Sequence, residues 1–389
     1  MMKAKNNSVI PVNKLISQKT AAYSAVAAYV FINGIFTFKY APDFRFAAFL
    51  MYVLFISGGI FLYKKIKFQE KTYKWLFWIV SLLFFIFTVI LNLKIDGYSL
   101  IVDRWSAMQS GADAILHNRF PYLEKSHQGQ PSSNLPGLVI LGIPFYLIFG
   151  NVQYLQNFCF LLFVFLVYRS LGNHRQRLLA LILLIVSPSY LWELYTKSDV
   201  FSNFVFALGY ALLVWKYFLK KRKIPIVWIA VLTALIMLTR LSVVLLLAVL
   251  LLKPFWNFTA KDKIKFLSAF GFTILFILFL FLRNAENTEM IMSHNPLLIQ
   301  GGKQPVLLSI FCLFLASLVS FKLNTFTEII SGIAGILFLT VFFTLIQKIM
   351  EFGLKASIDE SYMDLSFFSM AMPFLLIAIS MLNINPQKE

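Results

Sequence analysis

Charged side chains next to apolar segments are the residues of this sequence that could do chemistry. Asp103 follows an apolar run, so its carboxylate would stand at the boundary between water and lipid. Arg240 is isolated between two apolar stretches, and an Arg in such a place is a functional candidate because a charge at the bilayer centre costs at least about 3 kcal/mol. Lys197 stands between Glu193 and Asp199, so these three residues could neutralise one another in a structural network.

Each of these side chains also has a plain structural interpretation. The carboxylate of Asp103 could belong to a solvated helix face, and Arg240 could extend its guanidinium to the membrane surface while its stem stays in lipid. His294 could bind phosphate or move a proton, although a single His in a polar loop is more often solvated. The pattern leaves both interpretations of each residue open.

Metal and nucleotide sites have no signature in the sequence. The four histidines, His117, His127, His174 and His294, are scattered and do not have the spacing of a zinc site. We therefore expect no metal site, and only Asp103 and Asp113, which fall on one helical stripe, could take part in holding a divalent cation. The chain also lacks the Gly-rich loops that bind nucleotide phosphates.

The composition indicates which solvent surrounds the elements that carry these residues. Of the 389 residues, 59% are hydrophobic and 13% are charged, and the 43 Phe outnumber the 35 Lys and Arg together. This is too little polar surface to cover a water-soluble protein of this size, so the solvent must be lipid. The net charge of +18 would suggest nucleic acid in a soluble protein, but here the basic residues lie in short clusters between apolar runs. We therefore discount nucleic acid as a partner.

Apolar runs of about the length that crosses a bilayer recur along the chain, and they predict an all-α, polytopic transmembrane helix bundle with about 12 spans. We expect a cytoplasmic tail over 1–20 and a single transmembrane domain over 21–389. A structured outer loop over 94–135 would carry the active site. The expected spans are 21–39, 45–63, 75–93, 152–169, 178–194, 199–218, 225–239, 241–252, 266–283, 305–321, 326–345 and 364–382.

Basic clusters predict the orientation of the bundle. By the positive-inside rule, the loops near residues 64–74, 169–177, 220–223 and 253–265 face the cytoplasm, because each contains several Lys or Arg. The loop 94–135 and the segments around Lys197, Arg240 and 284–304 would then share the non-cytoplasmic face. We expect a multi-pass protein of the cell inner membrane or an equivalent membrane, with its active site on that outer face.

Two short apolar segments need a separate interpretation. The stretch from Leu138 to Phe149 is only about a dozen residues long and contains Pro144, which favours a partial or re-entrant element. The run around Arg240 has basic residues on both flanks. We expect it to form two short helices with Arg240 at an outer, wet tip.

The outer loop contains the pattern of an amphipathic helix. Apolar residues recur there at spacings of three and four, and polar residues fall on the opposite stripe. We expect this helix to lie along the membrane surface, with Trp105 and Met108 among the lipid headgroups and Asp103 turned toward a cavity. The apolar stripe is Ile101, Trp105, Met108, Ala112, Ile115 and Leu116.

The order of motifs from this loop onward resembles the GT-C superfamily of integral membrane glycosyltransferases, and most closely the polyprenyl-phosphate-mannose-dependent mannosyltransferases. Asp103 after a span, then Phe120-Pro121-Tyr122, then Asn134-Leu135-Pro136-Gly137 is similar to the first outer loop of that family. Later pieces that look similar are Ser187-Pro188-Ser189-Tyr190 with Asp199, Thr239-Arg240, and the segment from His294 to Gln304. The resemblance covers most of the chain from about residue 75 onward. The first 70 residues have no counterpart in it, and Arg119-Phe120 replaces a pair that usually contains Gly.

The resemblance implies an inverting transfer of mannose or another hexose from a polyprenyl-phosphate donor to a hydroxyl of a lipid-linked or cell-envelope glycan. Such a reaction needs a base near the acceptor hydroxyl and cations near the leaving phosphate. Asp103 matches the catalytic position, Asp96 is the alternative although it precedes Gly97 and could simply end a helix, and Asp113 and Asp199 are residual candidates. The donor phosphate would be bound by Arg240, Lys197, His294 and Lys303, and the other substrate contacts would come from Tyr122, Asn134, Asp199 and Gln300.

Two other functions fit a polytopic membrane protein. A transporter or flippase of a lipid-linked saccharide would place charges along a path near the middle of the membrane, and a polysaccharide polymerase would also have large outer loops. The acidic residues cluster at the expected outer ends of the spans, which favours the enzyme. The expected partners are thus membrane lipid, the lipid-linked sugar donor and the glycan acceptor, and the sequence has no signal for an oligomeric state.

Overall fold

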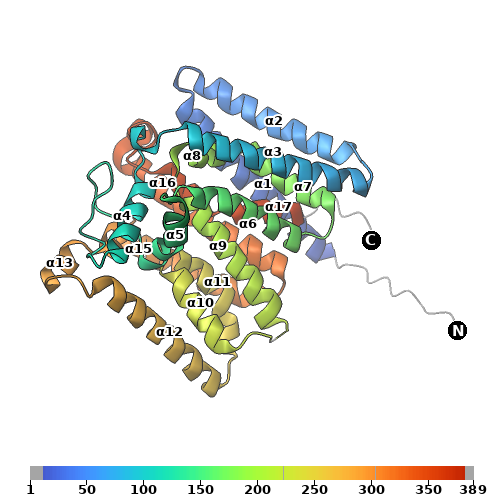
Figure 1. Ribbon diagram of the computed structural model, residues 1–389. Coiled ribbons are helices and arrows are strands. Elements are labelled where there is room, and N and C mark those ends of the chain that lie inside the picture. Colours follow the sequence, from blue (N-terminus) through green and yellow to red (C-terminus); the bar gives the residue numbers. More distant parts are fainter. Residues whose placement is uncertain (1–11, 222, 303, 382–389) are drawn as a thin grey trace.

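The computed structural model describes residues 12–221, 223–302 and 304–381, and within these ranges every regular element is a helix. Figure 1 shows them as a bundle in which the long helices run roughly side by side. The elements are α1 (Val12–Tyr40), η1 (Pro42–Phe44), α2 (Arg45–Lys65), α3 (Glu70–Lys94), η2 (Gly97–Ser99), α4 (Arg104–Leu116), α5 (Pro136–Phe149), α6 (Tyr154–Ser170), α7 (His174–Ile185), α8 (Pro188–Thr196), α9 (Val200–Leu213), the π-helical η3 (Val214–Leu219), α10 (Ile226–Met237), α11 (Val243–Trp256), α12 (Ala260–Leu282), α13 (Thr288–Ser293), α14 (Pro296–Gly301), α15 (Val306–Lys322), α16 (Phe326–Ile358), η4 (Leu365–Met370) and α17 (Met372–Met381).

The chain is an integral, multi-pass helical membrane protein. Among the described residues, seven helices are long and apolar enough to cross a membrane, or nine if each bent helix pair is a single span. Four further apolar helices are shorter: α5, α10, α11 and α17. Most of the expected spans coincide with these helices, but the span 178–194 is divided between α7 and α8 and the span 364–382 between η4 and α17. A total of about 12 spans stays a prediction.

The centre of the bundle is α17, which packs against α1, α6, α7, α9 and α16. Nine of its ten residues are buried, which explains why this short helix is apolar on every side. By contrast, α2 and α12 lie at opposite edges of the bundle in Figure 1 and bury few of their apolar side chains. In a membrane these exposed faces contact lipid.

The expected span 178–194 is divided into two helices that meet at an angle of 59°. Ser187 and Pro188 cause this break, because Pro fits the first turn of a helix and the Ser187 side chain accepts a hydrogen bond from the Tyr190 N–H. Asn33 of α1 supports the new helix start, since its Oδ1 accepts hydrogen bonds from Ser187 Oγ at 2.6 Å and from the Ser189 N–H at 3.2 Å. The break directs α8 toward the polar interior described below.

Two of the turns that carry the expected basic clusters, the α2–α3 turn and the α6–α7 turn, contact each other. The Glu70 side chain accepts a hydrogen bond from the His174 N–H, and Arg175 donates one to the carbonyl of Tyr63, so the α2–α3 turn contacts the start of α7. In Figure 1 this turn lies at the opposite end of the bundle from α4 and α13. This separation agrees with the expected segregation of basic turns and outer loop, and the assignment of either end to the cytoplasm stays a prediction.

The helix expected in the outer loop forms, but its surroundings differ from the expectation. Trp105 and Met108 of α4 are 1% exposed and pack with Leu138 of α5 and with Leu155 and Cys159 of α6, so they do not lie among lipid headgroups. The short apolar helix α5 packs against α4 and covers the face that we expected to meet lipid. The correction is that α4 is a packed helix of the bundle.

Gly137 brings the start of α5 against the end of α10. Its N–H donates a hydrogen bond to the carbonyl of Leu238 at 2.8 Å, and a Cβ at this position would stand 2.5 Å from the carbonyl oxygen of Leu235. Only Gly permits this close backbone approach. The contact fixes the turn between α10 and α11, which carries Arg240.

Candidate functional site

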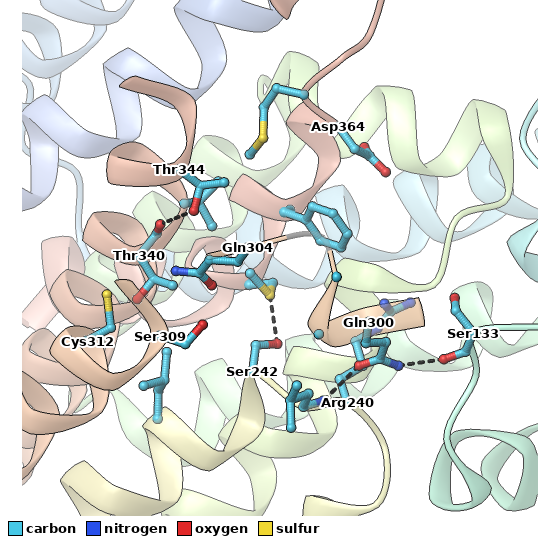
Figure 2. A pocket seen from close by; sticks show the side chains of 18 of the residues that line it. Ser133, Arg240, Ser242, Gln300, Gln304, Ser309, Cys312, Thr340, Thr344 and Asp364 are labelled. Carbon is cyan, nitrogen blue, oxygen red and sulfur yellow. Dashed lines mark hydrogen bonds between the residues drawn. The ribbon is translucent and has the colours of Figure 1, made fainter. Parts of the chain in front are cut away.

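A cavity of about 570 Å³ lies among the α10–α11 turn, α14, α15, α16 and the segment before η4. Figure 2 shows polar side chains from these segments pointing into it. Leu241, Val244, Leu245, Leu313 and Val341 supply apolar wall, and Arg104, Arg240, Lys348 and Asp364 are its charged lining residues. A cavity with apolar walls and a few placed charges is typical of a binding site for a small molecule.

Arg104 reaches the cavity from the first turn of α4. Its guanidinium donates hydrogen bonds to Asp364 and, at 3.0 Å, to Ser198 Oγ, and it lies over the ring of Phe367. The pKa of Arg104 is raised: burial opposes the charged form, but the carboxylates of Asp364, Asp199 and Glu193 together outweigh it. Arg104 is therefore a permanent cation at the edge of the cavity.

Asp364 is the carboxylate that lines the cavity. Its side chain is 39% exposed, and it precedes η4, whose residue Ser366 donates hydrogen bonds to it from both N–H and Oγ. Arg104 holds the other carboxylate oxygen. These contacts fix the direction of the carboxylate while leaving part of it accessible from the cavity.

Arg240 lies in the turn between α10 and α11, as expected, so the apolar run does form two short helices. Its side chain is not at a wet tip, however, because the residue is only 5% exposed and donates a hydrogen bond from Nη2 to Oδ2 of Asp199 at 2.5 Å. Asp199 precedes the first residue of α9 and is buried as well. The lone Arg thus avoids lipid by pairing with a carboxylate inside the protein.

Gln300 of α14 connects two segments beside the cavity. Its Oε1 accepts a hydrogen bond from the Leu241 N–H at 2.9 Å, and its Nε2 donates one to the carbonyl of Ser133 at 2.6 Å (Figure 2). Gln300, which we predicted as a substrate contact, lines the cavity. Its amide is used to hold the α10–α11 turn next to the end of the outer loop.

Asp103, the expected base, does not line the cavity. It precedes α4, and its Oδ2 accepts a hydrogen bond from Ser126 Oγ at 2.5 Å, which ties the helix start to the outer loop. Asp103 is adjacent to Arg104 in sequence, and of these two side chains only that of Arg104 lines the cavity. Asp96 is exposed and caps η2 by accepting a hydrogen bond from the Tyr98 N–H.

Lys197 is buried in a different set of contacts from the one we expected. Its Nζ donates hydrogen bonds to Gln153 Oε1 and to the carbonyl of Asn92, so it pairs with neither Glu193 nor Asp199. Burial lowers the pKa of Lys197 to about 8, against the opposing effect of the Asp96 carboxylate. The predicted network of three residues is wrong, because Lys197 bonds to Gln153 and to the Asn92 carbonyl instead. Lys197 has left-handed backbone angles after α8, and it does not line the cavity.

The remaining predicted residues lie in three places. Asn134 is buried and donates a hydrogen bond to the carbonyl of Arg104 at 3.4 Å, so it supports the first turn of α4. Tyr122 packs against Phe281 in an apolar cluster outside the cavity. His294 ends α13 and contacts its own helix, and Lys303 lies outside the described residues.

Asp113 belongs to a surface network. Its carboxylate pairs with Arg119 and accepts a hydrogen bond from Tyr146 Oη at 2.6 Å, and Arg119 also pairs with Glu124. Within the described ranges, no three His, Cys, Asp or Glu side chains form a group that could hold a metal ion.

Sequence reasoning missed Arg104 and Asp364 as members of the site. The signal for Arg104 was its place directly after Asp103, in the loop already singled out. Asp364 opens the last apolar run of the chain, which is the same kind of boundary that drew attention to Asp103 and Asp199. The sequence does not indicate that Arg104 and Asp364, which are 260 residues apart, meet in space.

Comparisons with known proteins give no match: no family model, no curated protein and no solved structure is significantly similar to this chain.

Proposed function

We propose that this protein is an integral membrane glycosyltransferase that takes a sugar from a polyprenyl-phosphate donor and passes it to a hydroxyl of a glycan or glycolipid acceptor. The cavity carries this proposal, because it combines the buried Arg240, the partly buried Arg104 and a carboxylate with apolar helix walls. An amphiphile with an anionic headgroup is the class of ligand that meets both parts.

Arg104 and Arg240 would bind the phosphate of the donor. Arg240 uses only Nη2 for its bond to Asp199, so other guanidinium donors are available beside the cavity. The planar guanidinium matches the geometry of a phosphate group better than an ammonium does. Fixed cations next to the phosphate would stabilise the negative charge that grows there as the sugar leaves.

The apolar side of the cavity would take the start of the prenyl chain. Leu245 of α11, Leu313 of α15 and Val341 of α16 supply this surface, and each of these three helices is predominantly apolar. A hydrocarbon chain is stabilised there by removal of its surface from water. The phosphate and the chain thus have separate surroundings in one cavity.

Asp364 is the carboxylate that we assign as proton acceptor for the attacking hydroxyl. It lines the cavity, whereas Asp103 does not, and Arg104 and Ser366 hold it in a fixed direction. Asp103 would then act on the reaction through the position of Arg104. The reaction is a displacement at the anomeric carbon: the acceptor oxygen forms the new bond, the phosphate leaves with its electron pair, and Asp364 takes the proton.

The proposal is tested by donor binding and transfer with purified protein. Farnesyl phosphate and farnesyl-phosphate sugars are short donors, and Arg240→Lys is the first variant because it keeps the charge that pairs with Asp199. We expect this variant to weaken binding of farnesyl phosphate by about 10- to 100-fold, as for loss of a hydrogen bond to a charged group. Arg283→Lys is the matched control, since Arg283 contacts Asn118 outside the cavity. Absence of binding and of transfer with every donor would exclude the proposal.

A transporter of lipid-linked saccharides is the second candidate. The observation that favours it is the buried Arg240–Asp199 pair at the ends of short helices, because transporters often bind substrate where helices are interrupted. Liposomes separate the two candidates. Movement of a labelled lipid-linked saccharide between leaflets, without cleavage of its phosphate–sugar bond, would favour the transporter.

A further inference from the structure

One wall of the cavity carries uncharged hydroxyl and amide groups. Ser309 of α15, Thr340 and Thr344 of α16, and Gln304 just before α15 all line it. Figure 2 shows Thr340, Thr344 and Ser309 on one side of the cavity and Arg240, Gln300 and Ser133 on the other. We call the four residues Ser309, Thr340, Thr344 and Gln304 the hydroxyl wall.

The hydrogen bonds of the hydroxyl wall define what it can offer a ligand. Thr340 Oγ1 donates to the carbonyl of Ile336 at 2.8 Å, and Thr344 Oγ1 donates to the carbonyl of Thr340 at 2.9 Å. Ser309 Oγ donates to the carbonyl of Pro305 at 3.2 Å. Each hydroxyl has therefore used its only proton, and its oxygen can still accept.

Gln304 supplies the complementary group. Its Nε2 is buried and has no hydrogen-bond acceptor among the described residues. A buried amide N–H₂ without an acceptor is costly unless a bound molecule satisfies it. The hydroxyl wall thus presents several acceptors and one unsatisfied donor to the cavity.

The charges of the cavity show where an anion would not bind. Figure 2 shows Arg240 on the side of the cavity opposite Ser309, Thr340 and Thr344, and Lys348, a further cation of the described lining, pairs with Glu351 at 3.0 Å. A neutral ligand that both donates and accepts hydrogen bonds fits the wall better than a second phosphate. Sugar hydroxyls have this property, because each is a donor and an acceptor.

We infer that the hydroxyl wall is the glycosyl subsite, which binds the uncharged hydroxyls of the donor sugar while the phosphate faces Arg104 and Arg240. The inference rests on the proposed function and adds the residues that select the sugar. Sugar hydroxyls donate to the oxygens of Ser309, Thr340 and Thr344, and one of them accepts from Gln304 Nε2. Specificity among hexoses then depends on α15 and α16 rather than on the outer loop.

Back-bonded Thr and Ser residues are common in membrane helices, so position rather than bonding distinguishes this group. Thr273 of α12 donates to the carbonyl of Ala269 at 2.7 Å in the same way, yet it does not line the cavity. Thr273→Val is therefore a control matched in chemistry and helical setting to Thr340→Val. Valine has the shape of threonine without the hydroxyl, which keeps the packing of both helices.

The experiment compares the binding of three ligands to wild-type protein and to the Thr340→Val, Ser309→Ala and Thr273→Val variants. The ligands are farnesyl phosphate, farnesyl-phosphate hexose, and a farnesyl hexoside that lacks phosphate. The protein is kept in a detergent without a sugar headgroup, because a glycoside detergent would compete for the wall. We expect Thr340→Val and Ser309→Ala each to weaken both sugar-bearing ligands by about threefold to tenfold, the effect of one hydrogen bond. Binding of farnesyl phosphate should change by less than about twofold.

The three ligands separate failure of the inference from failure of the proposed function. Unchanged affinity for both sugar-bearing ligands in the wall variants would overturn the inference. It would also be overturned if the wall variants lost as much affinity for farnesyl phosphate as for the sugar-bearing ligands, or if Thr273→Val weakened the sugar-bearing ligands as much as Thr340→Val does. The wild-type protein could instead bind the farnesyl hexoside through the wall but not bind farnesyl phosphate. This result would support the glycosyl subsite and exclude a phosphate-linked donor.

Discussion

Arg240 and Asp199 form an ion pair inside the protein, with side chains that are 6% and 2% exposed. The two residues stand 41 positions apart, each at the end of a short helix, and each would be an unpaired buried charge without the other. Burying a single charge in a membrane protein is expensive, so the pair explains how Arg240 is tolerated between two apolar helices.

The pair makes a first prediction about stability. Arg240→Met should destabilise the protein by about 3–5 kcal/mol, because it leaves the Asp199 carboxylate buried without its partner. The double variant Arg240→Met with Asp199→Leu should be more stable than Arg240→Met alone, since both charges are gone. Thermal unfolding in one detergent measures this. If the stability loss of the double variant equals the sum of the losses of Arg240→Met and Asp199→Leu, the two residues act independently.

Removal of the Asp364 charge should reduce transfer more than removal of the Asp103 charge. We expect Asp364→Asn to lower kcat by roughly 10²–10⁴, the contribution of a positioned base, with little change in KM for the donor. Asp103→Asn keeps an acceptor for the Ser126 hydroxyl and should retain most of the activity. The reverse order of effects would return the role of base to Asp103.

Lys197 predicts how stability depends on pH. Its folded pKa of about 8 is below the ordinary value for Lys, so between these values the unfolded chain binds a proton that the folded protein does not. Stability should therefore rise with pH through this window, and Lys197→Met should remove that part of the rise. Melting temperatures at pH 7.5 and 9.5 for both proteins check the sign. Parallel changes in the two proteins would count against a lowered pKa.

The burial of α4 can be tested with one helix residue and one loop residue. Trp105→Ala should cost about 3–5 kcal/mol because it opens a cavity against α5 and α6. Ile101→Ala should be close to neutral, since Ile101 is 92% exposed. Equal, small effects of the two changes would mean that Trp105 lies in lipid, as the sequence pattern indicates.

Gly137 should not tolerate a side chain. In Gly137→Ala the new Cβ would meet the backbone of Leu235 and Leu238, so the α10–α11 turn must shift, at about 1–3 kcal/mol. Gly271→Ala in α12 is the control, because a Cβ there meets nothing within 4 Å. The control should be neutral or slightly stabilising. Ligand affinity measured alongside stability would show whether the shift reaches Arg240.

The sequence predicted the helices well because the bilayer fixes how long an apolar run must be. The expected spans 45–63 and 152–169 agree closely with α2 and α6, and the division of the run around Arg240 into two helices is confirmed. The break at Ser187-Pro188 was missed, although a Ser followed by a Pro is a familiar helix start. Hydrophobicity alone does not distinguish a continuous span from two bent pieces.

The candidate site was less predictable, because it depends on which helix ends meet. Asp103 and Arg104 are neighbours in the sequence, yet only Arg104 reaches the cavity. The pairing of Arg104 with Asp364 joins the first outer loop to the last helices, and no local pattern encodes a contact between such distant segments. For α4, the helical spacing of the apolar residues indicates an apolar face, but it does not indicate whether lipid or α5 covers that face.

Gln300 has a mechanical consequence for α14. One amide bonds both to the backbone of the α10–α11 turn and to the backbone just before α5, so the three segments are fastened at a single point. If α14 swings outward, both bonds break together, and the turn bearing Arg240 loses its tie to the outer loop in the same event. Movement of α14 and movement of the turn that carries Arg240 are therefore mechanically coupled.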